Sequence, residues 1–224
     1  MRKIFRVAVP GTLLLVCGAI QSLAQAQFKP AEVISAPDIS PPIQSIADGV
    51  VVLDSSLDEK GAVTGITVVR DVPSLTSPAT SSLQSWKFAP ASRQGKAEPS
   101  VMRVAVVFRP RSYLAASPTF TPILTGEGAN ARDQGYEPPG ILSVSYPQYP
   151  INAAVPGTVM VQVTVGKSNA LQRLRVVRDL PPFSQAALSA LSKWHFQAAK
   201  LNGKPTASSL AIAFVFAPLS SGEF

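Results

Sequence analysis

Apolar and polar residues alternate in several stretches of the second half of the chain, and this pattern predicts β-strands. Residues 158–165 place four valines on one face, with Thr158, Gln162 and Thr164 on the other. Residues 171–177 alternate again after a turn at 166–169, with Arg173 and Arg175 on the wet face. A period of two is typical of a strand with one buried face.

A helix and a third strand are predicted after these two. Pro181 and Pro182 interrupt the second strand, and Ser184 is expected to cap the helix through its hydroxyl. An apolar stripe at helical spacing then follows: Phe183, Ala187, Leu191 and Trp194. Residues 210–217 alternate bulky and small apolar residues, which predicts the last strand. The order strand, strand, helix, strand indicates an α+β unit, with a three-stranded sheet covered on one face by a helix.

The same unit occurs twice along the chain. Residues 49–110 align with 157–218 at a constant offset of 108 positions, without insertion or deletion. Among the matching blocks, Val68–Asp71 corresponds to Val176–Asp179, and Trp86 with Phe88 corresponds to Trp194 with Phe196. We therefore predict two tandem β-β-α-β domains, each closing its own core, since two units are too few for a solenoid. The first copy has weaker helix signals and is expected to be the degenerate, less stable one.

The predicted boundaries follow from this repeat and from proline-rich connectors. They are a signal peptide at 1–26, a leader at 27–40, a first domain at 41–112, a linker at 113–142, a second domain at 143–219 and a tail at 220–224.

The N-terminus changes how the net charge of +7 is interpreted. Three basic residues precede an apolar run from Val7 to Ile20, and Ala24-Gln25-Ala26 resembles a cleavage signal, which is the layout of a secretory signal peptide. An uncleaved signal that anchors the chain in the inner membrane remains the alternative. Without residues 1–26, 17 basic and 13 acidic residues remain, so the mature charge is +4 and gives little support for nucleic-acid binding. The single cysteine, Cys17, leaves with the signal, which excludes disulfides and thiol chemistry.

The residues that remain offer little material for catalysis. His195 is the only histidine, and we interpret it as a surface residue beside a core tryptophan. No hydrolase, zinc-protease or P-loop motif is present. The repeated pairs Arg70-Asp71 and Arg178-Asp179 are expected to close the second strand of each copy, and Trp86 and Trp194 to fill the cores. We therefore expect no catalytic residues, no metal, no cofactor and no small-molecule substrate.

An open sheet edge is the feature that these units offer a partner. Edge strands carry unpaired backbone N–H and C=O groups, which accept an extended peptide as an added strand. The alternative is an edge that is blunted or that pairs with another copy of the protein. Periodicity does not choose between the two.

The second copy resembles the C-terminal domain of TonB. The resemblance rests on Tyr149-Pro150, the alternating valines from Gly157, Ala186-Ala187-Leu188, Trp194-x-Phe196, Asn202-Gly203-Lys204-Pro205 and the closing apolar strand. The segment Pro147–Pro150 is similar to the Q-P-x-Y-P segment of that family, with Tyr146 in the place of its glutamine. In the first copy Pro41-Pro42 replaces Tyr-Pro.

This resemblance implies a periplasmic protein that binds the extended TonB-box peptide of an outer-membrane transporter, or another envelope protein, by strand addition. Carried over by position, the implied binding residues are the final strand and the segment before the first: Ser209, Leu210, Ala211, Ile212, Ala213, Phe214, Val215 and Phe216, with Tyr146, Pro147, Gln148, Tyr149 and Pro150. No histidine precedes His195, and about 20 residues separate the signal from the first copy, so we expect a binding protein rather than a transmitter of force. The alternative is an envelope scaffold or homodimer that uses the same sheet edges.

Overall fold

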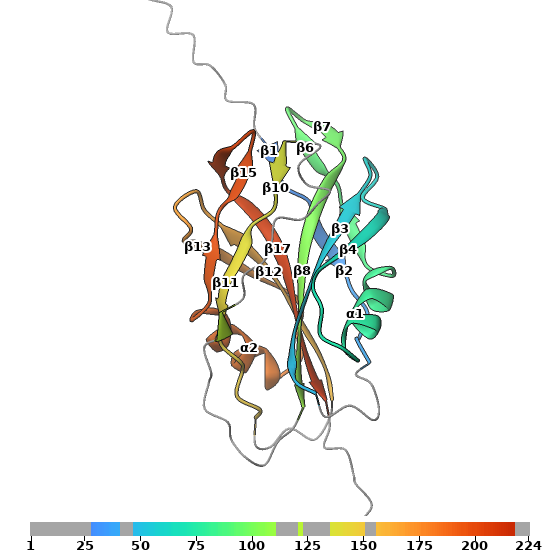
Figure 1. Cartoon of the computed structure of the whole chain (residues 1–224), viewed down its shortest axis with the longest axis vertical. Coiled ribbons are helices and arrows are strands. Elements are labelled where there is room, and N and C mark those ends of the chain that lie inside the picture. The colour runs from blue at the N-terminus through green and yellow to red at the C-terminus, as the bar shows by residue number, and fades with distance from the viewer. Residues whose placement is uncertain (1–27, 41–46, 111–120, 123–134, 151–155, 218–224) are drawn as a thin grey trace, which may run out of the picture.

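The computed structural model describes residues 28–40, 47–110, 121–122, 135–150 and 156–217. The expected signal peptide and tail lie outside these residues. A six-stranded sheet in the order β13-β12-β17-β8-β3-β4 runs along the long axis of the molecule, and the helices α1 and α2 lie on opposite sides of it (Figure 1).

Each half of the chain contributes three adjacent strands and one helix to this arrangement. The first half supplies β3 (Gly49–Leu57), β4 (Val63–Arg70), α1 (Thr76–Leu83) and β8 (Ser100–Pro110). The second half supplies β12 (Gly157–Val165), β13 (Leu171–Arg178), α2 (Phe183–Leu191) and β17 (Ser208–Ala217). The main elements thus follow one another as strand, strand, helix and strand in both halves, and three short strands intervene between each helix and the last strand.

The two halves form one sheet, which corrects the prediction of two separate three-stranded sheets. The last strands β8 and β17 lie side by side and pair in parallel, with Ala211 opposite Val104 and Phe214 opposite Val107. Because the central pair is parallel and the helices cover opposite faces, an approximate two-fold axis runs along the strands between β8 and β17. Both strands are apolar on their two faces, and strands of this kind are stable only in the interior of a layered fold.

Each face of the sheet carries one hydrophobic core, and each core draws on both halves. The core under α1 includes Ala211, Ala213 and Val215 of β17. The core under α2 includes Ala105 and Val107 of β8, and Val50 and Val52 of β3. Neither half closes a core of its own, so the expected independence of the two copies is wrong.

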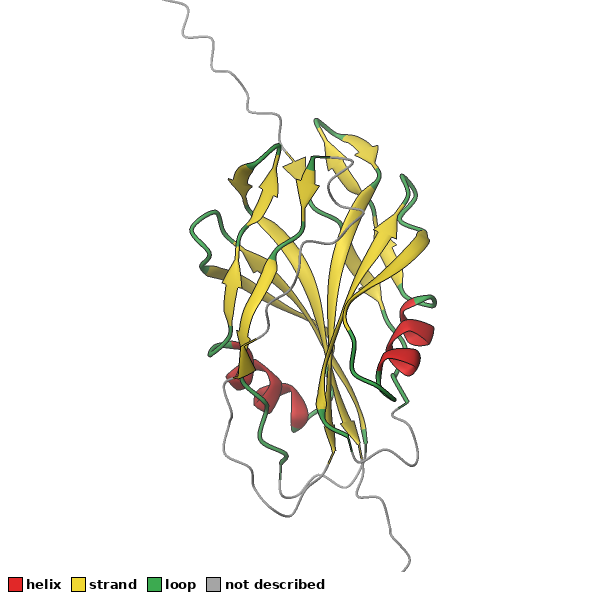
Figure 2. Cartoon of the chain, in the orientation of Figure 1, coloured by secondary structure: helices red, strands yellow, loops and turns green. Residues whose placement is uncertain are grey.

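Short strands pair into small sheets that lie beside the large one (Figure 2). In the first half these are β1 (Phe28–Lys29), β2 (Glu32–Ser35), β5 (Lys87–Ala89), β6 (Ala91–Arg93) and β7 (Lys96–Glu98). In the second half they are β10 (Tyr136–Glu137), β11 (Gly140–Val144), β14 (His195–Gln197), β15 (Ala199–Leu201) and β16 (Lys204–Thr206). The two-residue strand β9 (Thr121–Pro122) pairs with β11.

The repeat therefore begins earlier than the sequence suggested. β1 and β2 pair with β6 and β5, as β10 and β11 pair with β15 and β14, at the same offset of 108 positions. Ala31, Val33 and Ile39 of the expected leader are buried in the core under α1. The leader and the last residues of the expected linker are thus structural parts of the two halves.

Each helix begins with a hydroxyl that accepts a hydrogen bond from a preceding backbone N–H. Ser184 Oγ accepts from Leu180 N at 2.8 Å, and Thr76 Oγ1 accepts from Val72 N at 3.0 Å. Ser184 lies inside the first turn of α2 and Pro182 precedes the helix without a side-chain cap, so the predicted capping role of Ser184 is corrected.

Candidate functional site

The final strand β17 is the most completely paired strand of the second half. Every residue from Gly157 to Val165 of β12 faces it on one side, and β8 pairs with residues 211–217 on the other. The prediction that Ser209–Phe216 form an open edge is therefore wrong. A peptide could add to β17 only by displacing a neighbouring strand.

The second predicted segment, Tyr146–Pro150, lies beside α2 without regular secondary structure. The indole Nε1 of Trp194 donates a hydrogen bond to the Ser145 carbonyl oxygen at 2.9 Å and fixes the start of this segment. The ring of Tyr149 meets Phe183 and Phe216 edge-on, with centroid distances of 5.3 and 5.8 Å. The segment is thus held by two aromatic anchors, while Gln148 is exposed.

A cleft of about 570 Å³ separates this segment from α2. One wall is Ser145–Pro150, and the other consists of Pro182, Gln185, Ala186, Ser189, Ala190 and Lys193. Among the described lining residues Lys193 is the one that carries a charge, and the other side chains combine rings, small apolar groups, hydroxyls and amides. Such a mixture of apolar walls with a few polar groups is typical of a binding site.

A second cleft of about 490 Å³ lies across the same helix. It shares Pro182, Gln185 and Ser189 with the first, and Asp179, Pro181 and Leu188 are among its other lining residues. The outer face of α2 therefore has a hollow on each side.

The outer strands of the six-stranded sheet are β13 and β4. Each pairs with its inner neighbour through a register with two irregularities, at Met160/Val161 and Thr164/Val165 for β13, and at the corresponding points for β4. Irregularities of this kind bend an edge and blunt it against pairing with another chain.

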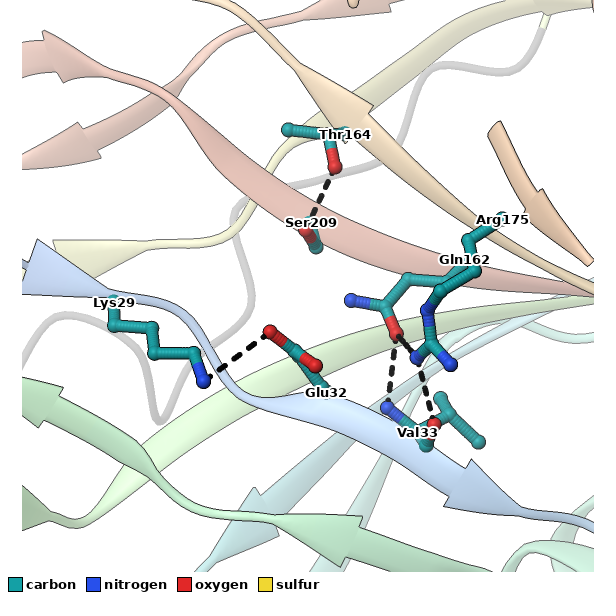
Figure 3. A network of polar contacts seen from close by, with 7 residues as sticks. All are labelled: Lys29, Glu32, Val33, Gln162, Thr164, Arg175 and Ser209. Atoms are coloured by element: carbon teal, nitrogen blue, oxygen red, sulfur yellow. Dashed lines mark hydrogen bonds and ion pairs between the residues drawn. The ribbon is translucent and has the colours of Figure 1, made fainter. Parts of the chain in front are cut away.

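Side chains of the second half hold the N-terminal segment of the first (Figure 3). The Gln162 side-chain oxygen accepts hydrogen bonds from Val33 N at 3.0 Å and from Arg175 Nη2 at 2.5 Å, and Arg175 donates to the Val33 carbonyl oxygen at 2.8 Å. Further along, Ile39 N donates to Thr158 Oγ1, Thr158 N donates to Asp38, and Arg178 pairs with Asp38. These contacts join the halves in addition to the shared sheet.

On the opposite face, Tyr146 contacts charged residues of the first half. Its ring lies 5.6 Å from the guanidinium carbon of Arg109, whose Nη1 is 3.7 Å from Asp48. Burial raises the pKa of Tyr146; Asp48 adds to this effect, whereas Arg70 and Arg109 oppose it. Among the described residues, Arg70 Nη1 and Arg109 Nε are buried without a hydrogen-bond acceptor.

Two buried polar contacts connect the central strands β8 and β17 to residues 136–139. Arg103 donates to both carboxylate oxygens of Asp54, at 2.7 and 2.8 Å, and to the Pro139 carbonyl oxygen at 3.3 Å. The hydroxyls of Tyr136 and Ser208 lie 2.6 Å apart, and burial raises the pKa of Tyr136 to about 12. Sequence reasoning missed both pairs, although Asp54 and Arg103 stand out as charges within apolar strands.

The tryptophans and arginines considered for chemistry have the predicted structural roles, but Trp194 lies after the end of α2 at Leu191 and not on the helix. Trp86 and Trp194 are buried in the two cores, and Arg70 and Arg178 end β4 and β13. His195 is exposed in β14, with its Nδ1 2.8 Å from Ser143 Oγ. Within the described ranges, no group of three or more His, Cys, Asp or Glu residues could hold a metal ion, and no helix is long and apolar enough to cross a membrane.

The sequence profile of the Gram-negative bacterial TonB protein C-terminal domain matches two segments of this chain, residues 43–110 and 143–218. Neither a curated protein nor a solved structure matches. The two matched segments include the large strands and helices of both halves, and the second begins just before Tyr146–Pro150. Domains of this family work in the Gram-negative envelope, where they interact with outer-membrane transporters or other envelope proteins. The chain belongs to the family of TonB C-terminal domains and contains two copies of it, which are joined in one sheet.

Proposed function

We propose that this chain is a non-catalytic periplasmic protein of TonB-dependent transport that binds an extended segment of an outer-membrane transporter or of another envelope protein. The cleft between Tyr146–Pro150 and α2 is the observation that carries this proposal. The bound segment lies along the cleft, between the proline-rich wall and the outer face of the helix.

The composition of the cleft suits an extended ligand. Pro147, Pro150 and Pro182 have no backbone N–H, so their part of the wall offers rings and carbonyl oxygens. Gln148, Gln185 and Ser189 supply hydrogen-bonding groups at the surface. Apolar contact with a few polar groups that fix orientation is the usual basis of peptide recognition.

Strand addition at β17 is not part of this proposal, because both sides of that strand are paired. Addition at β4 or β13 is less favourable than binding in the cleft, because each edge has two irregularities in its register.

Ser189 gives a direct test of the cleft. It is exposed on α2 and lines both hollows, and Ser81 is the exposed residue at the corresponding position of α1. Ser189→Arg fills the cleft with a long side chain, and we expect it to weaken the binding of a TonB-box peptide at least tenfold. Ser81→Arg adds the same side chain to the other helix and is expected to leave binding unchanged. Both variants are made in residues 27–224 and titrated by NMR.

The chemical-shift changes in this titration give the position of the bound peptide as well as its affinity. We expect them at Gln148, Gln185, Ser189 and Lys193. Wild-type affinity in Ser189→Arg, or shifts confined to β4 or β13, would show that the cleft is not the site. If no transporter TonB-box peptide binds, the transporter is not the partner.

A second candidate function rests on the outer strands β4 and β13, which have no further strand beside them in the described sheet: copies of the protein would pair edge to edge as an envelope scaffold, in spite of the irregular registers. Sedimentation over a hundredfold range of concentration separates the two. A sedimentation mass that equals the mass of one chain at every concentration excludes the scaffold.

A further inference from the structure

The approximate two-fold symmetry places Asp38 and Tyr146 at corresponding positions, since both lie in the segment before the first long strand of their half. In the same way Arg178, at the end of β13, corresponds to Arg70, at the end of β4. Asp38 accepts hydrogen bonds from Arg178 and from Thr158 N. One half therefore supplies a carboxylate to the arginine of the other.

The symmetry-related contact, between position 146 of the second half and Arg70 of the first, lacks this carboxylate. Position 146 is a tyrosine, which cannot neutralise Arg70, and Arg70 Nη1 is buried with no acceptor among the described residues. Arg109 also lies beside Tyr146, and its Nε is likewise buried without an acceptor among those residues. Asp48 is the one acid that acts on Tyr146 within the described residues; it lies 3.7 Å from Arg109 and is half exposed.

Two guanidinium groups near Tyr146 thus each keep a buried donor without an acceptor among the described residues, and Asp48 pairs with one of them, Arg109. A buried donor without a partner costs about 1–3 kcal/mol, and more where the group is charged. A planar carboxylate can accept two hydrogen bonds from a guanidinium group and removes this cost.

We propose that Arg70, Arg109 and Tyr146 form a receptor for a carboxylate of a partner protein. The site joins the two halves, because both arginines come from the first and the tyrosine from the second. Arg70 and Arg109 supply the charge, and the Tyr146 hydroxyl supplies a further hydrogen-bond donor.

The molecule shows the kind of group that fits. On the other face, an extended segment, Ala36-Pro37-Asp38-Ile39, brings its carboxylate to Arg178 while Ala36 and Ile39 are buried beside it. A partner segment with an acidic residue between apolar ones carries the same kind of group, but it would reach Arg70 from beside Tyr146, because Tyr146 itself occupies the place that corresponds to Asp38. Tyr146 also lines the cleft beside α2, so this site lies next to the cleft but does not depend on peptide binding there.

The test uses residues 27–224 with labelled arginine side chains, titrated at constant ionic strength with acetate and with the peptide Ala-Pro-Asp-Ile, blocked at both ends. We expect saturable shifts of the Arg70 and Arg109 Nε–Hε resonances with both ligands, a peptide affinity at least tenfold higher than that of acetate, and no response at Arg178. Chloride at the same ionic strength is the control.

Reciprocal exchange of the two positions then provides matched variants. Tyr146→Asp supplies the missing carboxylate internally and is expected to abolish the response of Arg70. Asp38→Tyr removes the carboxylate from Arg178 and is expected to make that residue respond. Arg70→Gln tests the site without altering either segment, and is expected to weaken acetate binding at least tenfold.

Equal responses of Arg70 and Arg178 in the wild type, or an unchanged response of Arg70 in Tyr146→Asp, would overturn the proposal. A peptide affinity no higher than that of acetate would overturn the assignment to a protein partner. If Asp38→Tyr does not fold, the Tyr146→Asp and Arg70→Gln variants decide the question.

Discussion

The two halves share one backbone plan but differ in how they satisfy buried polar groups. In the first half β3 and β8 carry the ion pair Asp54–Arg103. At the corresponding positions the second half has Gln162, which binds the N-terminal segment, and Ala211, which packs in the core under α1. The same fold therefore accepts a buried charge pair on one face and an amide with an alanine on the other.

This difference shows what duplication within one chain permits. In a homodimer of identical chains, any substitution would occur at both symmetry-related contacts at once. Here the two symmetry-related contacts between the halves have different residues. Asp38 and Arg178 form an ion pair on one face, whereas on the other face Arg70 Nη1, near Tyr146, has no acceptor among the described residues. The two halves share the backbone arrangement, and the candidate carboxylate site lies where their side chains differ.

The largest effect is expected from Arg103, because its loss leaves Asp54 as a charge buried without a partner. Removal of one member of a buried ion pair costs about 3–5 kcal/mol. We expect Arg103→Ala to lower the free energy of unfolding by that amount, measured by urea denaturation with circular dichroism.

A double variant separates loss of the pair from loss of packing. Arg103→Leu with Asp54→Leu removes both charges, and we expect it to recover most of the loss, since apolar replacements of buried pairs are often neutral. A cost below about 1 kcal/mol for Arg103→Ala would mean that Asp54 is solvated rather than buried.

The N-terminal segment provides the next test, because it joins the first half to the second. Val33 is buried and Ile34, its neighbour, is exposed. Val33→Ala removes two methyl groups from the core and is expected to cost about 2 kcal/mol of unfolding free energy. Ile34→Ala is the matched control and should change it by less than about 0.5 kcal/mol. Equal effects would show that the segment is not part of the core.

The strands and helices of the large sheet could be predicted because their periods are strong. The valines of β12 and the apolar stripe of α2 lie in the core as predicted. The merger of the halves was missed, although a signal for it was present. Residues 210–216 are apolar on both faces, which indicates a strand inside a sheet rather than at its edge.

The binding site was predicted less completely for a physical reason. Tyr146–Pro150 could be singled out from local sequence, but the cleft depends on how α2 lies against it. Arg70 and Arg109 are about 35–75 residues from Tyr146 in sequence and meet it only across the shared sheet. Periodicity describes the faces of one element and does not show which distant elements meet.

Tyr136 gives a smaller effect that depends on pH. Its pKa rises from an ordinary 10.0 to about 12, chiefly because the hydroxyl is buried. A raised pKa in the folded state means that its stabilisation is complete below pH 10 and is lost as the pH rises from 10 toward 12. We expect the wild type to lose up to about 1.4 kcal/mol per pH unit more than Tyr136→Phe in this range. Parallel urea titrations of both proteins at pH 9, 10 and 11 would contradict this if their difference stayed constant.

The smallest predicted effect comes from Phe28, which corresponds to Tyr136 in the other half. Tyr136 donates or accepts a hydrogen bond with Ser208, whereas Phe28 has no hydroxyl, and the hydroxyl of the corresponding Ser100 is buried without a partner in the described part of the chain.

A cavity of about 240 Å³ lies at this position, and Phe28 and Ser100 are among its lining residues. Phe28→Tyr therefore places a hydroxyl where there is both space and an unpaired group. A net hydrogen bond contributes about 0.5–1.5 kcal/mol, so we expect the variant to be more stable by that amount in urea denaturation. The same substitution in a Ser100→Ala background should give no gain, because the partner hydroxyl is absent. A gain that persists in that background would come from ring packing against Tyr136, 5.3 Å away, and the two halves would then differ at this position in packing rather than in hydrogen bonding.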